Sequence, residues 1–428
     1  MKQLSRKLSI GAVAVAAMVA SIPSRAVDIT FYYPIAVSGP LTKIIDGLAA
    51  DFEKANPDVK VKPVYSGNYG ETLAKALTAN RSGQPPQVAV LVASDALTLI
   101  DEDAVVPMEG FVKTASDKTW IDGFFPAFLM NGRYEGKTYG VPFQRSTQVM
   151  YWNKAAFRDA GLDPNRPPAN WDELVEYGKK LTVKDGAGKV TRWGLIVPSG
   201  VTSHWFLQGF TTQNRAKLQN DAGTETYLAT PEAIESLQFW VDLSRKHEVM
   251  QRGIIDTGTA PAEFIEGRAA IMFHSTGNLT NVKNNAKFEF GVAMLPARKQ
   301  RGSATGGGSI YIFKKSTPEQ LEASYRFVKW LTSAEQAARW SIQTGYVAPR
   351  QDAWDLATMK DYAKSFPPAA VALEQLPFCA PEFSTHDGPR TTKALEDAIE
   401  ASITGTKPVP AALRDAQAEA TRILRTFK

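Results

Sequence analysis

The stretch VDITFYY (27–33) and the stretch LTKIIDGLAADF (41–52) that follows it decide the fold class. The first is short, apolar and rich in β-branched and aromatic residues, a composition typical of a strand. In the second, apolar residues recur at helical spacing and form one stripe: Leu41, Ile44, Ile45, Leu48, Ala49 and Phe52. Asn56-Pro57 ends this helix, because a residue before proline avoids helical backbone angles.

The same alternation continues along the chain. A strand is predicted over 59–64 despite Pro63, a helix over 73–83, and a short apolar strand over 87–92. An order of strand, helix, strand, helix, strand predicts parallel pairing with right-handed crossovers. The pattern returns after residue 148, with no tandem repeat and no low-complexity linker. We therefore predict an α/β fold of two lobes, each a mainly parallel sheet flanked by helices.

The length of 428 residues suits two lobes better than one core. We predict that the chain crosses between the lobes, so that each lobe is discontinuous. Residues 27–140 with about 279–340 form the first lobe, and residues 141–278 with about 341–428 form the second. Crossings near Val141–Gln144 and Phe273–Asn278 are expected to act as hinges.

Residues 1–26 have the layout of a secretory signal peptide. The start is positively charged, residues 8–20 are apolar, and Ser24-Arg25-Ala26 supplies small residues for cleavage after Ala26. The apolar run is shorter than the roughly 20 residues that a membrane-spanning helix needs. We therefore expect export to a bacterial periplasm, with no membrane span in the mature protein.

The net charge argues against nucleic acid or anionic lipid as a partner. The whole chain has 49 basic and 44 acidic residues, but four of the basic residues and none of the acidic ones lie in the leader. The remaining 45 basic and 44 acidic residues give no electrostatic attraction to either partner. The single cysteine, Cys379, excludes an intrachain disulfide.

Motifs for catalysis and metal binding are missing from the sequence. The four histidines (204, 247, 274 and 386) lack ligand spacing, and no G-x-S-x-G segment occurs. Gly306-Gly307-Gly308-Ser309 lacks the lysine of a Walker loop, so it predicts a tight turn or a backbone that faces a ligand. We expect no catalytic residue, no metal site and no cofactor.

Several stretches together carry a family resemblance. They are YGVPF (139–143), MYWNKAAF (150–157), AGLDP (160–164), WDEL (171–174), FIEGRAAIM (264–272), FVKWLTS (327–333) and TGY (344–346). In this order they resemble the family 1 extracellular solute-binding proteins of ABC importers. SGNY (66–69) is similar to the members that bind sn-glycerol 3-phosphate. The resemblance implies two lobes that close over a solute, with permease and ATPase subunits as partners.

The resemblance also implies ligand-binding residues. By their motifs they are Tyr69 of GNY, Ser146 after PF-x-x, Ser275, Thr276 and Gly277 after a buried strand, Gly307 of the glycine turn, and Tyr346 of TGY. A late arginine that holds phosphate corresponds to Arg390. Hydroxyls, turn N–H groups and a guanidinium suit a phosphate ester. The alternative roles are packing for the two tyrosines and helix capping for Ser275 and Thr276.

Two positions differ from the family pattern. The family has an acidic residue after the strand at 87–92, where this chain has Ala93 followed by Ser94 and Asp95, and we expect Ser94 and Asp95 to be ligand-binding residues. The family also stacks tryptophans on its ligand, and only Trp205 lies nearby here. We expect Arg145 to face the cleft and attract an anion; the alternative is a surface arginine paired with an acid. A glycerophosphodiester or another small anion fits this wider pocket.

The predicted function is capture of sn-glycerol 3-phosphate or a related phosphate ester, for delivery to a membrane permease. A neutral sugar or oligosaccharide is the alternative for the same architecture. A secreted phosphodiester hydrolase is the alternative from another class. A monomer is expected, because one copy presents both lobes.

Overall fold

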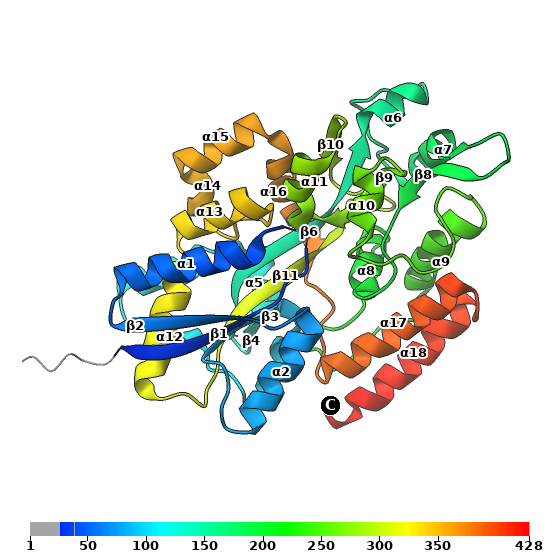
Figure 1. The fold of residues 1–428 in the computed structure, drawn as a ribbon. Helices are drawn as coiled ribbons and strands as arrows, with labels where there is room; N and C mark the ends of the chain where they lie inside the picture. Colours follow the sequence, from blue (N-terminus) through cyan, green and yellow to red (C-terminus); the bar gives the residue numbers. More distant parts are fainter. Residues whose placement is uncertain (1–25, 38, 428) are drawn as a thin grey trace, which may run out of the picture.

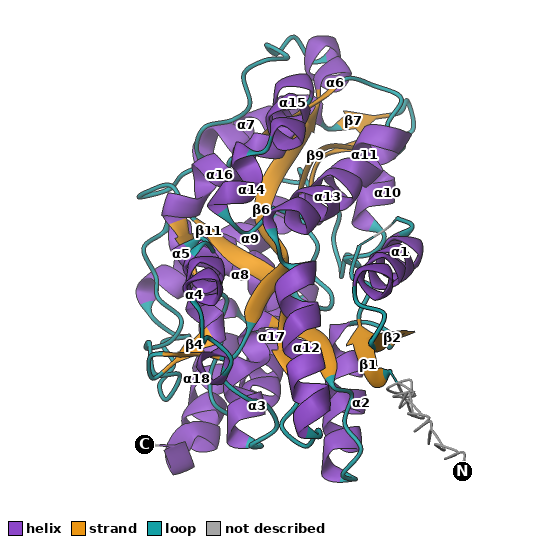
Figure 2. Ribbon diagram, turned by 90° about the vertical axis from the view of Figure 1, so that its left-hand side faces the viewer, coloured by secondary structure: helices purple, strands orange, loops and turns teal. Residues whose placement is uncertain are grey.

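The computed structural model describes residues 26–37 and 39–427. Figure 1 shows helices and strands gathered in two halves, with long strands crossing the middle of the molecule. Helices cover both faces of the sheet (Figure 2). The predicted leader lies outside the described residues, apart from Ala26. Over residues 26–37 and 39–427, no helix is both long and apolar enough to cross a membrane.

One sheet runs through both halves in the order β2-β1-β3-β11-β6-β9-β8-β7, with β10 paired to β6 and β12 to β11. Its strands are β1 Val27–Tyr33, β2 Val59–Tyr65, β3 Val88–Val92, β6 Val141–Asn153, β7 Val183–Lys184, β8 Val190–Ile196, β9 Ala269–Ser275, β10 Phe290–Ala293, β11 Ser303–Ile312 and β12 Cys379–Ala380. A separate hairpin joins β4 Arg133–Tyr134 to β5 Lys137–Thr138.

The α/β class is confirmed, but the sheet is mixed where a mainly parallel sheet was expected. β1 is parallel to β2 and β3, and β8 is parallel to β9. β11 is antiparallel to β3 and β6, and β6 is antiparallel to β9 and β10. The difference arises because β6 and β11 run back through both halves. Pro63 is tolerated in β2 because this strand lies at the edge of the sheet.

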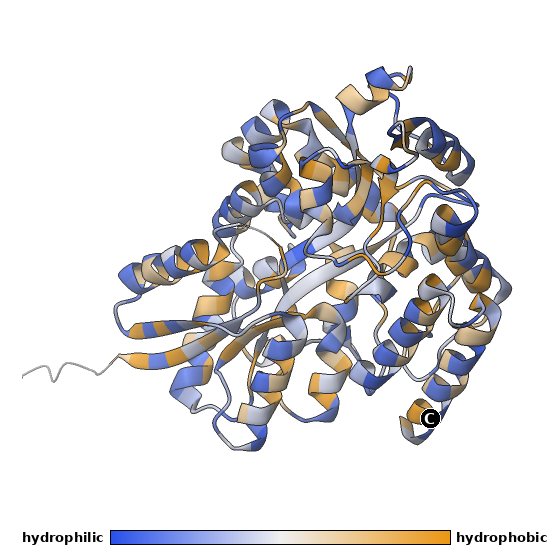
Figure 3. Ribbon diagram, turned by 45° about the vertical axis from the view of Figure 1, so that its right-hand side comes forward, coloured by the Kyte–Doolittle hydropathy of each residue, from blue (hydrophilic) through white to orange (hydrophobic). Residues whose placement is uncertain are grey.

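Eighteen α-helices surround this sheet in the described part of the chain. They are α1 Leu41–Ala55, α2 Tyr69–Arg81, α3 Ala96–Asp101, α4 Ala115–Asp122, α5 Pro126–Leu129, α6 Lys154–Asp159, α7 Trp171–Leu181, α8 Ser203–Gln213, α9 Pro231–Arg245, α10 Ala260–Ile265, α11 Leu279–Asn285, α12 Pro318–Leu331, α13 Ala334–Thr344, α14 Gln351–Asp355, α15 Ala357–Ser365, α16 Val371–Gln375, α17 Gly388–Thr404 and α18 Val409–Ile423. Most alternate between polar and apolar residues along their length (Figure 3), as helices that bury one face do.

Each half has its own hydrophobic core. In the first, Phe31 of β1 and Phe52 of α1 pack edge-on against Phe327 of α12. In the second, Trp171 of α7 and Trp240 of α9 are fully buried. Edge-on aromatic contacts add to the free energy gained by burying these large side chains. The predicted boundaries of the two lobes stay a prediction.

The two cores are joined by β6 and β11. Val141 and Phe143, near the start of β6, belong to the first core, and residues 149–152, near its end, belong to the second. The partner strand β11 bends at Gly307, whose φ of +90° is a left-handed conformation that favours glycine. A Cβ atom there would lie 1.9 Å from the carbonyl oxygen of Gln144 on β6. Close strand packing therefore depends on this glycine.

We predict that Gly307→Ala lowers the free energy of unfolding by about 3 kcal/mol or more, measured by urea denaturation. The substitution has two costs. The new Cβ atom clashes with the Gln144 carbonyl, and alanine is strained in the left-handed backbone conformation of residue 307. Gly188→Ala is the matched control, since Gly188 has a φ of +81° but open space around it. This control isolates the backbone strain, expected to be about 1 kcal/mol. Equal losses in the two variants would contradict the packing argument.

Candidate functional site

A cavity of about 90 Å³ lies where the two halves meet. Its lining comes from ten parts of the chain: Ala36, Val37, Tyr69, Val92, Ser146, Thr202, Trp205, Thr257, His274, Ser275, Gly307, Tyr346 and Glu382. Pockets for drug-sized ligands usually have roughly 300–1,000 Å³. In this conformation the cavity therefore suits a small solute, and a larger one needs the halves to move apart.

The cavity brings together six of the residues expected at the ligand site: Tyr69, Ser146, Trp205, Ser275, Gly307 and Tyr346. Thr276 and Gly277 are buried next to Ser275 but do not line the cavity. The Ser275 hydroxyl accepts a hydrogen bond from the N–H of Gly277 at 3.0 Å, so this side chain also caps the short turn after β9. Ligand binding by these residues stays a prediction.

Three aromatic rings form much of the cavity wall. Trp205 of α8 donates its indole N–H to the carbonyl of Thr305 at 3.0 Å. A Cβ atom on Gly306 would lie 2.6 Å from this indole, so the ring rests directly on the β11 backbone. The Tyr69 hydroxyl donates to Gln144 at 3.1 Å, and burial raises the pKa of Tyr69 well above its ordinary value. The rings are thus fixed in place before any solute enters.

Arg145 does not take the position expected from the sequence. Its side chain is fully buried, yet it is not among the residues that line the cavity. Its Nη1 donates to the Gly307 carbonyl at 2.8 Å, and its guanidinium carbon lies 5.4 Å from the centre of the Phe128 ring. The hypothesis of a cleft-facing arginine is therefore corrected, as is the alternative of a surface arginine. Arg145 lies behind the β11 backbone and supports Gly307.

Arg390 also lies elsewhere. It is an exposed residue of α17, where its guanidinium pairs with Asp387 at 2.8 Å. Arg390 was expected to hold the phosphate of a ligand, but it is an exposed residue near the start of a helix and does not line the cavity. Ser94 and Asp95 lie just after β3 without lining the cavity; the Ser94 carbonyl accepts a hydrogen bond from Ser384 at 2.7 Å.

Glu382 is a cavity residue that the sequence analysis missed. Its side chain is only 5 % exposed, and it lies in an irregular segment between β12 and α17 that contains no recognised motif. The Asn131 side chain binds both backbone groups of Glu382. Its NH2 group donates to the Glu382 carbonyl at 2.8 Å, and its oxygen accepts from the Glu382 N–H at 2.9 Å. Within the described residues, the Oε2 atom of Glu382 has no hydrogen-bond partner. A buried carboxylate oxygen is therefore left for a solute to satisfy.

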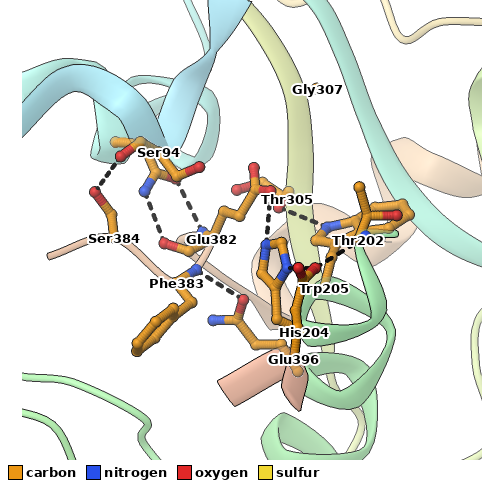
Figure 4. A network of polar contacts seen from close by, with 12 residues as sticks. Ser94, Thr202, His204, Trp205, Thr305, Gly307, Glu382, Phe383, Ser384 and Glu396 are labelled. Atoms are coloured by element: carbon orange, nitrogen blue, oxygen red, sulfur yellow. Dashed lines mark hydrogen bonds and ion pairs between the residues drawn. The ribbon is translucent and has the colours of Figure 1, made fainter. Parts of the chain in front are cut away.

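His204 of α8 stands between two carboxylates (Figure 4). Its Nε2 lies 3.7 Å from Glu382, and its Nδ1 lies 2.8 Å from Glu396 of α17. Burial alone would lower the pKa of His204, but its contacts with Glu382 and Glu396 outweigh burial and raise the pKa to about 9. The imidazolium is therefore charged at neutral pH and partly neutralises the cavity carboxylate.

Two other titratable groups adjoin the cavity. Burial, with repulsion from Glu382 second, raises the pKa of Asp95 to about 7. His274 is a structural histidine: its Nδ1 accepts from Ser275 and Asn278, and its Nε2 faces the carbonyl of Thr257 at 3.0 Å. Burial lowers its pKa to about 4, so His274 is neutral. Among the described residues, no cluster of three or more His, Cys, Asp or Glu side chains is placed to hold a metal ion.

Residues 47–368 match the model of a family described as bacterial extracellular solute-binding protein. The chain belongs to this family. Membership confirms the expectation of a solute-binding protein that is not an enzyme. The hydrolase alternative is therefore set aside.

Several known proteins are similar over nearly their whole length. The sn-glycerol-3-phosphate-binding periplasmic protein UgpB of Yersinia pseudotuberculosis is 29% identical, over 94% of this chain and 93% of the relative. UgpB from Mycobacterium tuberculosis in complex with glycerophosphocholine has a TM-score of 0.83 at 24% identity, covering 94% of this chain and 99% of the other. Maltose-bound MalE3 of T. maritima has a TM-score of 0.81 at 22% identity, and the match covers 93% of this chain and 100% of the other. The two structures agree with the two-lobed α/β fold.

We predict that the stability of this site depends on the protonation of His204. Between its ordinary pKa of 6.5 and its folded value of about 9, the folded chain holds a proton that the unfolded chain has lost. The free energy of unfolding should therefore fall as the pH rises from 7 to 9. Urea denaturation at several pH values measures this slope, and His204→Gln should flatten it.

His247→Gln serves as the control for this prediction. His247 is partly exposed, and burial followed by the charge of Lys179 lowers its pKa, so it does not titrate between pH 7 and 9. This variant should keep the slope of the wild type. Parallel slopes for wild type and His204→Gln would contradict a charged His204.

Proposed function

We propose that this protein is the solute-binding component of an ABC importer and captures a small polyhydroxylated solute, such as a sugar, in this cavity. The observation that carries the proposal is the buried Glu382 carboxylate, whose Oε2 has no partner among the described residues. A solute hydroxyl that donates to this oxygen removes the cost of burying it unpaired. Hydrogen bonds to charged groups contribute roughly 1.5–3 kcal/mol each.

The rest of the lining supports the same class of solute. Four hydroxyl side chains face the cavity: Ser146, Thr202, Thr257 and Ser275. The rings of Tyr69, Trp205 and Tyr346 supply apolar surface for the C–H faces of a sugar, as aromatic side chains do in pockets with few polar groups. Mixed donors, acceptors and flat rings recognise a molecule with many hydroxyls and no net charge.

A phosphate ester is the second candidate, supported by the names of relatives such as the Yersinia pseudotuberculosis protein and by the charged His204 beside Glu382. Against it, no arginine or lysine lines the cavity in the described part of the chain. The negative charge of Glu382 also repels a phosphate in a buried setting, where charges are weakly screened. The positions of Arg145 and Arg390 therefore favour the neutral sugar that the sequence left as the alternative.

We propose that capture involves closure of the two halves around the solute. The cavity lining includes Ser146 near the middle of β6 and Gly307 near the middle of β11, the two strands that join the halves, so bending of these strands opens or closes it. The predicted crossing at Val141–Gln144 falls within β6. The expected setting is the periplasm, with a monomer that delivers its solute to permease and ATPase subunits.

The decisive test is Glu382→Gln, with binding measured by thermal shift and titration calorimetry over neutral sugars, polyols and glycerol phosphates. A bound solute raises the melting temperature in proportion to its affinity and concentration. We expect a neutral sugar or polyol to stabilise the wild type, and Glu382→Gln to weaken its binding about tenfold or more. The loss follows because a charged acceptor is replaced by a neutral amide.

The same variant separates the two candidates by the sign of its effect. For a phosphate ester, removal of the Glu382 charge should strengthen binding. Asp172→Asn is the control, because Asp172 is highly exposed and lies outside the cavity lining. Stabilisation by glycerol phosphates alone, strengthened by Glu382→Gln, would overturn the sugar proposal.

A further inference from the structure

A second and larger cavity lies on the other side of the segment that carries Glu382. This groove has a volume of about 990 Å³, within the range of small-molecule sites. Residues 377–381 and Ser384 line it, while Glu382 faces the solute cavity. Its walls come from both halves, including Leu97 before the crossing of β6 and Leu218 after it. The solute-binding proposal assigns it no role.

The groove is strongly cationic. Arg133, Arg215, Lys217 and Arg301 line it, against the single acid Asp221. Lys217 pairs only loosely with Asp221, at 3.9 Å between two highly exposed side chains. No salt bridge joins the three arginines to a carboxylate in the described residues, although most other described arginines form one. Guanidinium groups without a carboxylate partner around one concave surface are suited to bind an anion.

The groove also has apolar surface that the fold does not cover. Phe378 is 42% exposed and Met130 is 40% exposed, and both are among the few large apolar side chains that stay accessible. Leu97 and Leu218 add buried apolar surface to the lining. A ligand that fills this groove therefore gains by burying a ring or chain as well as by pairing its charge.

Two amides connect the groove to the solute cavity. Asn131 and Gln208 both line the groove. Asn131 binds both backbone groups of Glu382, and Gln208 accepts from the N–H of Phe383 at 2.9 Å and donates to the carbonyl of Pro381. A ligand in the groove therefore contacts the side chains that fix the position of the Glu382 carboxylate.

We propose that this groove is a second binding site, for a small amphipathic anion that has one acidic head group and an apolar ring or chain. The head group pairs with Arg215 and Arg301, and the apolar part covers Phe378. The arginines without a carboxylate partner, the exposed ring and the concave shape each point to this class of ligand.

The test uses 1-naphthalenesulfonate as the probe, titrated into the protein by calorimetry. A sulfonate is chosen because it is not a phosphate ester and has no hydroxyls for the solute cavity. We expect saturable binding of one equivalent, weakened at least tenfold in Arg215→Ala/Arg301→Ala and several-fold in Phe378→Ser. Sulfate has the anionic head group without the ring, and 1-naphthol has the ring without the acidic group. Each should bind at least tenfold more weakly than the probe.

Two controls keep the outcome interpretable. Arg414→Ala/Arg425→Ala removes the same charge from exposed arginines outside the groove and should leave probe binding unchanged. Glu382→Gln, which tests the solute cavity, should also leave it unchanged, so the two proposals fail separately. Absence of saturable probe binding, or an equal loss in the two double-arginine variants, would overturn the second site. Melting temperatures of the variants verify that they are folded.

Discussion

The pairing of β6 with β11 is the constraint on which the rest of the structure depends. The two strands are antiparallel from Val141 to Thr147, and among the described strands only these two have residues in both cores. Gly307 has to accept a left-handed conformation beside the Gln144 carbonyl for this pairing to form. The same pairing places Ser146 and Gly307 side by side in the cavity wall. The geometry of the site is thus a consequence of how the halves are joined.

Charge placement around the cavity follows from this geometry. Arg145 does not line the cavity; its Nη1 binds the Gly307 carbonyl, while its buried Nε and Nη2 have no hydrogen-bond partner among the described residues. Glu382 reaches the cavity from the opposite side, with His204 and Glu396 behind it. The solute therefore meets a carboxylate whose charge is only partly balanced. This arrangement suits hydroxyl donors better than an anion.

Much of the fold could be predicted from the sequence, because local patterns determine it. The bounds of β1 and α1 match the strand expected at 27–33 and the helix expected from Leu41 to the Asn56-Pro57 stop, because their apolar patterns are regular. α8 was missed because every one of its residues is buried, so it has no polar face and no helical periodicity. α17 was missed as well, although it begins with Gly388-Pro389 and runs to Thr404.

The site was predicted only where a motif marked it. Tyr69, Ser146 and Tyr346 lie in recognisable motifs and line the cavity. Glu382 has no local signal, because an irregular segment is placed by distant partners such as Asn131, 251 residues away. The direction of Arg145 also could not be read from its neighbours, since all residues of β6 are buried on both faces.

The segment from Pro377 to Ser384 separates the two proposed binding sites. It is one chain thick, and successive residues face opposite cavities: Pro381 the groove and Glu382 the solute site. A shift of this segment changes the lining of both cavities at once. Asn131 and Gln208 bind its backbone through directional hydrogen bonds and so fix its position. Both proposed sites therefore depend on the same hydrogen bonds from Asn131 and Gln208, although different side chains line the two cavities.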